Sequence, residues 1–159
     1  VGLAGNPDLV RKASKLWMPV GSRVVIIGGE LVGLELAEFL HERGRQVTIV
    51  DDIAQFGRGL SPTRRSVMLE AMPDEGIVLH EAARDIAIGE TAVTFTTAGG
   101  EALSVPVDTV IIAKGAEADT GLFDALKAAG LAAHMVGDCR GVGYILGAVR
   151  DAADVAAKI

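Results

Sequence analysis

The sequence predicts an α/β fold with a central parallel sheet and an additional antiparallel β-meander. Two short apolar runs, residues 24–27 and 47–50, flank a segment with helical spacing, which is typical of two parallel strands joined by a helix. Three β-rich stretches follow in the middle of the chain, with the pair Gly99-Gly100 between the last two. The 159 residues suit one domain of ordinary size.

Composition excludes several classes of protein. Half of the residues are apolar and 23% are charged, which is enough for a core and argues against disorder. The formal net charge is −6, so nucleic-acid binding, which requires phosphates to be neutralised, is not expected. No apolar run approaches the roughly 20 residues that span a bilayer, so we expect no membrane partner and a cytoplasmic location. The one cysteine, Cys139, excludes an internal disulfide and a thiolate-rich metal site.

The first residues are typical of a linker. Residues 1–21 carry glycines and prolines around a short helical patch from Leu9 to Trp17. The sequence starts at Val1 without an initiator methionine, and we interpret it as a piece of a longer protein. N-terminal processing is the alternative.

A change in the spacing of apolar residues, from a continuous run to a helical period, predicts the first strand and the first helix after it. Residues 24–27 form a continuous apolar run, as in a strand buried on both faces, and two glycines end it. Apolar side chains then recur at helical spacing over residues 31–40, and Gly44 follows at a position that suits a helix C-cap. Residues 47–50 form the second strand.

Turn residues and apolar runs predict the remaining elements. In chain order we expect a helix over 62–72, an apolar stretch over 77–80, β-stretches over 84–88, 92–97 and 103–107, a buried strand over 108–115, a helix over 121–129, a short strand from about His134 and a helix over 144–158.

The join at residues 28–33 is the most informative segment for chemistry. A pyrophosphate is bound by backbone N–H groups at a helix N-terminus, and glycine lets the chain approach it closely. Gly28 and Gly33 fill the first and third positions of a G-x-G-x-x-G fingerprint, but Glu30 fills the second and adds a negative charge there. This context predicts a Rossmann-like three-layer nucleotide-binding domain. The alternative is that the glycines only permit a tight turn.

An acid at the end of the next strand supports nucleotide binding. Asp51 lies 23 residues after Gly28, and its carboxylate can accept hydrogen bonds from an adenosine ribose. Because its charge repels a 2′-phosphate, Asp51 favours NAD(H) over NADP(H). The alternative is an ordinary acid at a strand end. The arginines that could weaken this preference, or simply be solvated, are Arg58, Arg64 and Arg65.

Four segments carry a resemblance to a known family. They are VVIIGGELVGLELAEFLHERGRQVTIVD, LSPTRR, DTVIIAKGAEAD and MVGDCRGVGYILGAVRDAADVAAKI. Together they resemble the C-terminal half of the NADH:flavin oxidoreductases of the 2,4-dienoyl-CoA reductase and trimethylamine dehydrogenase type, which are related to the pyridine nucleotide-disulfide oxidoreductases. The resemblance covers nearly the whole chain from Ser22.

The resemblance implies domains and cofactors. After the linker, residues 22–133 correspond to an NAD(P)H-binding Rossmann-like domain, and residues 134–159 to the C-terminal strand and helix of an incomplete FAD domain. In the family the rest of that domain completes the FAD site, and a preceding TIM barrel carries FMN and a 4Fe-4S cluster. We therefore expect a nicotinamide dinucleotide as ligand here, and the missing FAD domain and barrel as partners in the parent chain. Self-association is left open.

The resemblance also implies roles for single residues. Glu35 corresponds to an acid near the nicotinamide carboxamide, or is simply an acid that suits a helix start. Lys114 replaces a usual threonine and would pair with phosphate or point into water, while Asp138 corresponds to the acid that binds the FAD ribityl chain. The predicted cofactor-binding residues are Gly28, Gly29, Glu30, Leu31, Val32, Gly33, Glu35, Asp51, Asp52, Gly115 and Asp138, and no catalytic residue or metal ligand is predicted.

The sequence thus predicts a module that holds NADH so that hydride passes to FAD in the parent oxidoreductase. Alone, the chain is not expected to turn over. Glu30 favours an alternative, a vestigial nucleotide domain that acts as a structural or electron-transfer scaffold, as in trimethylamine dehydrogenase-like proteins. A free-standing protein for an adenine nucleotide is disfavoured by the segment Gly137-Asp138.

Overall fold

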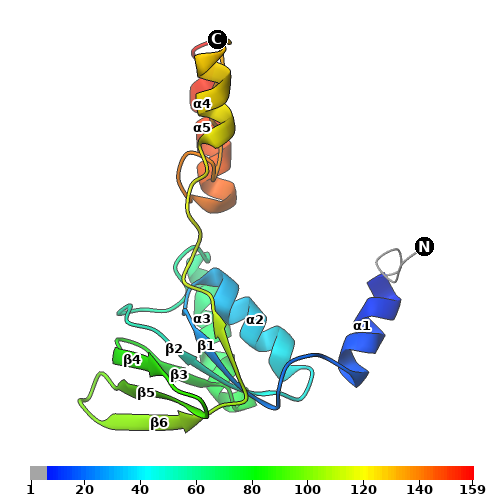
Figure 1. Ribbon diagram of the computed structural model, residues 1–159, viewed down its shortest axis with the longest axis vertical. Helices are drawn as coiled ribbons and strands as arrows, with labels where there is room; N and C mark the ends of the chain where they lie inside the picture. The colour runs from blue at the N-terminus through cyan, green and yellow to red at the C-terminus, as the bar shows by residue number, and fades with distance from the viewer. Residues whose placement is uncertain (1–6) are drawn as a thin grey trace. The chain divides into compact units, whose positions relative to one another are not determined.

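A computed structural model describes residues 7–159 of the chain (Figure 1). Residues 1–6, the start of the predicted linker, lie outside the described residues. The chain divides into two compact units, one ending at Lys114 and the other running from Gly115 to Ile159, and each is described by itself. No helix in the described part of the chain is long and apolar enough to cross a membrane.

The first unit is built on a four-stranded sheet whose strand pairs are all parallel. The order across the sheet is β3-β2-β1-β7, so the last strand of the unit lies beside the first. The strands are β1 (Arg23–Ile27), β2 (Gln46–Val50), β3 (Val78–His80) and β7 (Thr109–Ile112). The predicted parallel sheet is confirmed.

Two helices cover one face of this sheet, α2 (Leu31–His41) and α3 (Pro62–Glu75), and α1 (Pro7–Leu16) precedes β1. The helix α3 begins where the Ser61 hydroxyl accepts a hydrogen bond from a backbone N–H of the first turn. It ends at Glu75, three residues beyond its predicted end. The next residue, Gly76, is left-handed, with a φ of +93°.

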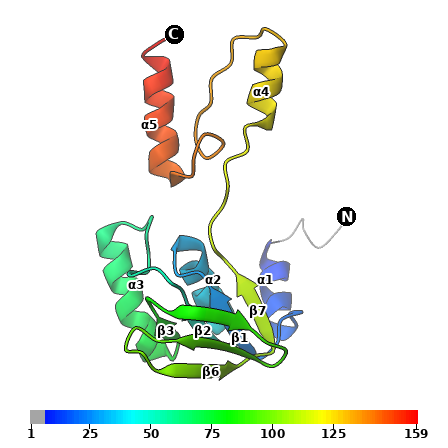
Figure 2. The same ribbon diagram turned by 60° about the vertical axis from the view of Figure 1, so that its left-hand side comes forward.

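A second sheet covers the opposite face. The strands β4 (Arg84–Ile88), β5 (Ala92–Thr96) and β6 (Ala102–Pro106) pair antiparallel in that order, as the sequence predicted. The turn between β5 and β6 is closed at Gly100, whose φ is +87° and whose N–H donates to the Thr97 carbonyl oxygen. The first unit therefore has three layers, helices, parallel sheet and meander (Figure 2).

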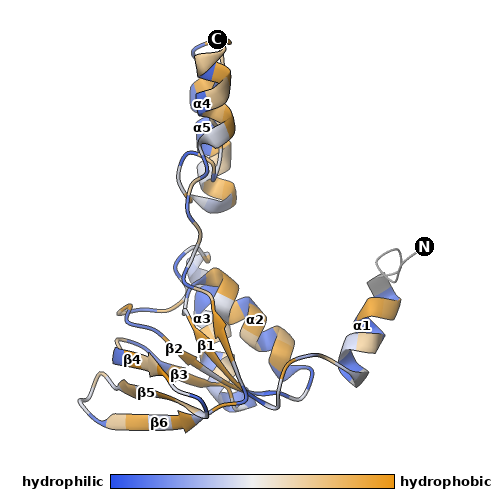
Figure 3. Cartoon of the chain, in the orientation of Figure 1, coloured by the Kyte–Doolittle hydropathy of each residue, from blue (hydrophilic) through white to orange (hydrophobic). Residues whose placement is uncertain are grey.

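Alternate residues of β1 face the two outer layers. Val24 and Ile26 pack with the helices, while Val25 and Ile27 pack with the meander. A strand covered on both faces must be apolar at every position, which explains the continuous run in the sequence. Figure 3 shows hydrophobic colouring along the central strands.

The second unit contains two helices, α4 (Gly121–Ala128) and α5 (Tyr144–Ala156), joined by residues 129–143 (Figure 2). Its described residues form no strand, so the short strand predicted from about His134 is wrong. A strand needs a neighbour for its backbone hydrogen bonds, and this unit offers none. The connection is instead tied to α5 through Asp151, which accepts hydrogen bonds from the Gly137 N–H at 3.2 Å and from Arg140 at 2.8 Å.

Candidate functional site

Close approaches shape the loop that joins β1 to α2. Gly28 has a φ of +134°, and a Cβ atom there would lie 2.2 Å from the Ala113 carbonyl oxygen. A Cβ on Gly33 would lie 1.8 Å from the Gly28 carbonyl oxygen, and one on Gly29 would lie 2.1 Å from the ring of Phe56. All three glycines are therefore required by the fold itself, and the loop backbone carries no side chain at these points.

Asp51 fastens this loop to the end of β2. Its Oδ2 accepts a hydrogen bond from the Gly29 N–H at 2.7 Å. Its Oδ1 accepts one from the Asp52 N–H at 2.8 Å and another from the Lys114 ammonium. The Asp51 side chain is only 2% exposed. Sequence reasoning assigned Asp51 to a ribose, and the structure gives it a further role as the tether of the loop.

Lys114 lies between two carboxylates. Its Nζ is 2.5 Å from Asp52 Oδ1 and also binds Asp51, so the alternative in which it simply points into water is wrong. Burial lowers the pKa of Lys114, but hydrogen bonds and charge from the two acids outweigh this effect, and the net pKa is raised. The hydrogen bond from Lys114 lowers the pKa of Asp52. Both groups are therefore charged at neutral pH.

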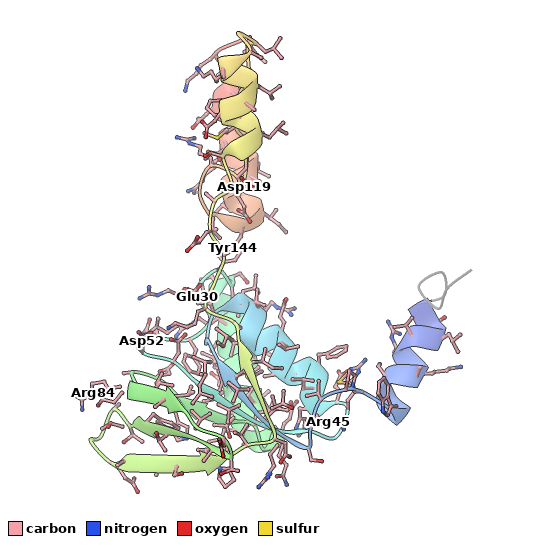
Figure 4. The ribbon with its side chains drawn as sticks, viewed as in Figure 1. Glu30, Arg45, Asp52, Arg84, Asp119 and Tyr144 are labelled. Atoms are coloured by element: carbon pink, nitrogen blue, oxygen red, sulfur yellow. The ribbon has the colours of Figure 1, made fainter. Side chains whose placement is uncertain are left out.

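A hollow of about 480 Å³ opens beside this ion pair. Aliphatic side chains form much of its wall, and two acids and two cations lie around it. The lining residues are Ile27, Asp52, Ala83, Arg84, Asp85, Ile86, Ile88 and Lys114. Figure 4 labels Asp52 and Arg84, which project from the same side of the first unit.

Sequence reasoning missed the part of the hollow that comes from the meander. The pairing of β4 with β5 is irregular between Arg84 and Ala87, and Asp85 has a left-handed φ of +55°. Non-glycine residues adopt this backbone rarely, and functional sites are enriched in it. A β-rich stretch could be predicted from the sequence, but nothing in its alternation marks this irregularity.

The two glutamates of the predicted site begin α2. Glu30 is the N-cap residue, with an extended backbone, and its side chain caps none of the helix N–H groups in the described structure. Leu31 and Val32 form the first turn. Glu35 is exposed and forms an ion pair with Arg64 of α3 at 3.3 Å.

The segment after β2 contacts the glycine loop and helps to hold it in place. The Gly57 N–H donates to the Gly29 carbonyl oxygen at 2.8 Å, and the Phe56 N–H donates to Glu81 Oε1 at 2.7 Å. The Nε of Arg65 donates to the Phe56 carbonyl oxygen at 2.6 Å, so this arginine has a structural role rather than a solvated one. Sequence reasoning also missed Phe56, because no local pattern links it to the loop.

The remaining predicted residues, Gly115 and Asp138, belong to the second unit. Asp138 Oδ1 accepts hydrogen bonds from the N–H groups of Gly143 at 3.0 Å and Tyr144 at 3.2 Å, so it holds the start of α5. The structure brings together the predicted residues Gly28, Gly29, Gly33, Asp51 and Asp52 in the first unit.

The chain is similar in sequence to several reductases. It is 37% identical over 122 residues to a bilirubin reductase of Mediterraneibacter gnavus, covering 77% of this chain and 19% of the relative. It is 29% identical over 143 residues to a cinnamate reductase of Clostridium sporogenes, covering 88% of this chain and 21% of the relative. The chain thus spans about a fifth of the length of these relatives.

Solved structures share the fold. A 2-naphthoyl-CoA reductase matches with a TM-score of 0.77 and 25% identity, over 89% of this chain and 22% of that one. A histamine dehydrogenase from Rhizobium sp. 4-9 matches with a TM-score of 0.71 and 18% identity, over 88% of this chain and 23% of that one.

These likenesses confirm the resemblance to flavin oxidoreductases that the sequence motifs carry. The family model described as pyridine nucleotide-disulphide oxidoreductase matches residues 5–139. The chain belongs to this family and is a domain of the flavin and pyridine-nucleotide oxidoreductases.

Proposed function

We propose that this chain binds NAD(H), in preference to NADP(H), and presents it for hydride transfer to FAD in a longer parent protein. The carrying observation is the loop between β1 and α2, where added Cβ atoms on Gly28, Gly29 and Gly33 would lie within 2.2 Å of other atoms. A loop without side chains at these three positions, at the start of a helix, suits a pyrophosphate. The nicotinamide supplies the hydride, and the chain's own residues bind and orient it.

In this proposal the adenosine lies at the ends of β1, β2 and β7. The sequence assigned the ribose to Asp51, but that side chain is buried and holds the loop. We therefore assign the ribose to its neighbour Asp52, which is 67% exposed. The aliphatic side chains of Ile27, Ala83 and Ile86 line the neighbouring hollow and suit one face of an adenine ring. Leu31, Val32 and Glu30 provide the first turn of α2 beside the phosphates.

The charges around the hollow favour NAD(H). Two acids, Asp52 and Asp85, and two cations, Arg84 and Lys114, line the hollow. The buried Asp51 beside Lys114 brings the formal balance to −1. A 2′-phosphate would add further negative charge at this point. Glu35 would orient the nicotinamide end, and its ion pair with Arg64 fixes the position of its carboxylate.

The proposed parent protein completes the reaction. Residues 22–133, which include Gly115, would form the nucleotide domain, and residues 134–159 would contribute Asp138 to an FAD site. The rest of that FAD site, and a barrel with FMN and a 4Fe-4S cluster, would lie elsewhere in the parent. The relatives named above, of which the matched segments are about a fifth, support that organisation.

A scaffold without nucleotide binding is the second candidate. It is favoured by Glu30, because an acidic residue at the N-cap of α2 adds a negative charge at the end of the helix that the phosphates would approach. In that case the glycines serve only the packing of β1, α2 and the Phe56 segment.

Calorimetric titration of the chain with NADH tests the proposal. We expect micromolar binding by the wild type and several-fold weaker binding by Asp52→Ala, because the exposed ribose acceptor is lost. Asp154→Ala removes another exposed carboxylate, from α5, and is the matched control, expected to bind like the wild type.

The variant Glu30→Gly separates the two candidates. Binding by the wild type supports the nucleotide module, whereas binding that appears only after Glu30→Gly supports the scaffold. Absence of binding in both proteins would overturn the nucleotide role altogether. Tighter binding of NADPH than of NADH would contradict the proposed preference.

A further inference from the structure

The backbone of Lys114 is fixed by the same contacts that shape the glycine loop. Lys114 lies two residues after the end of β7. The preceding residue, Ala113, donates its N–H to the Ile27 carbonyl oxygen at 2.7 Å. The carbonyl oxygen of Ala113 lies against Gly28 and leaves no room for a side chain there. The pairing of β7 with β1 therefore fixes the position of the Lys114 backbone. Its ammonium lies at the ends of β1 and β2.

The ammonium binds the two acids that follow β2. It contacts the buried carboxylate of Asp51 and lies 2.5 Å from the Asp52 Oδ1. The Lys114 side chain is 40% exposed, so its charge also acts on a ligand in the adjoining hollow. Without it, Asp52 and Asp85 would line that hollow, with Asp51 behind them, and only Arg84 would balance their charge.

We propose that Lys114 is a specificity-determining residue, which weakens the discrimination of this site against a 2′-phosphorylated adenosine by neutralising Asp51 and Asp52. The inference rests on the proposed function, because it places the adenosine ribose beside these acids. The cation acts most on the ligand with the larger negative charge, so its loss harms binding of a 2′-phosphate more than binding of a free hydroxyl. Asp51 and Asp52 therefore make the site prefer a free 2′-hydroxyl to a 2′-phosphate, and Lys114 determines how large this preference is.

Lys114→Met is the central test variant, because methionine keeps a long unbranched side chain and removes the charge. Lys12→Met, on the exposed side of α1, removes the same charge elsewhere and is the matched control. Lys114→Arg restores a cation and is expected to restore the wild-type ratio. The ligands are 5′-AMP and 2′,5′-ADP, which report on the adenosine end alone, together with NADH.

We expect the ratio of Kd for 2′,5′-ADP to Kd for 5′-AMP to rise about tenfold in Lys114→Met at low salt, and to stay unchanged in Lys12→Met. The difference should shrink at high ionic strength, because the hollow is open to solvent. A merely structural role for Lys114 would weaken both ligands equally and leave the ratio unchanged.

The outcomes separate this inference from the proposed function. NADH binding with an unchanged ratio in Lys114→Met overturns the inference and leaves the function standing. A raised ratio in a chain that fails to bind NADH overturns the function and leaves the inference standing. Failure of the wild type to bind any of the three ligands overturns both.

Discussion

Both compact units contain helices with apolar side chains, but only the helices of the first unit bury such side chains. Every buried hydrophobic side chain in the described part of the chain lies between Val24 and Val107, in the first unit. The helices α4 and α5 of the second unit have no buried residue. An apolar face predicts a helix in both units, but only a sheet or another helix packed against it turns that face into a core.

A pair of identical substitutions gives the largest expected contrast. Ile26 is 0% exposed and Ile145 is 84% exposed. Ile26→Ala should destabilise the first unit by about 2–5 kcal/mol, because a buried side chain leaves a cavity. Ile145→Ala should change stability by less than about 0.5 kcal/mol. Urea denaturation followed by circular dichroism measures both, and equal losses would refute the contrast in burial.

Two glycines inside helices sharpen the comparison with effects of opposite sign. A Cβ on Gly33 of α2 would lie 1.8 Å from a backbone oxygen, whereas one on Gly147 of α5 would meet nothing within 4 Å. Gly33→Ala should cost up to about 3 kcal/mol by overpacking. Gly147→Ala should instead stabilise its helix by up to about 1 kcal/mol, because alanine has the higher helix propensity. Hydrogen exchange of peptides from α2 and α5 would show the two changes separately.

Two aspartates that accept hydrogen bonds from backbone N–H groups provide a third comparison between the units. Asp51 is buried and binds both Gly29 and Lys114, while Asp138 is exposed and binds the start of α5. Asp51→Asn should cost roughly 1.5 kcal/mol, at the low end for hydrogen bonds to charged groups because Lys114 is half-exposed. Asp138→Asn keeps an acceptor oxygen in water and should cost less than about 0.5 kcal/mol. Thermal denaturation at neutral pH tests this order, which a larger loss in Asp138→Asn would reverse.

The smallest expected effect concerns acid stability. The side-chain hydrogen bond from Arg23 lowers the pKa of Asp108 to about 2. Asp108 therefore binds its proton less tightly in the folded state than in the unfolded chain, where the pKa of an aspartate is near 3.9. The bridge contributes its stability above about pH 4 and loses it as the pH falls through about 2. The Tm of the wild type should fall more steeply over this window than that of Asp108→Asn, while Asp154→Asn keeps the wild-type slope.

Much of the first unit could be predicted because its signals are local. The strand from Arg23, the helix after the glycines and the three meander strands follow from periodicity and turn residues within short windows. The second unit shows the limit of this reasoning. The apolar residues around His134 satisfy a local strand pattern, but a strand also needs a partner that no local window can supply.

The candidate site was predictable only where its residues belong to one sequence motif. The glycines and the acids after β2 follow from a motif and its spacing. The ion pair of Lys114 with Asp51 joins residues 63 positions apart, and Phe56 reaches Gly29 from a different segment. Such contacts depend on strand order and on the register of β1 with β7, neither of which composition or spacing determines.

The pairing of β7 with β1 has a consequence for synthesis of the protein. Val24 lies opposite Thr109, so 85 residues of chain must leave the ribosome before this edge of the sheet is closed. Until then the backbone of β1 has no hydrogen-bond partner on its β7 side. Once residues 109–112 have left the ribosome, β7 closes this edge, and the nascent chain no longer offers it to another strand.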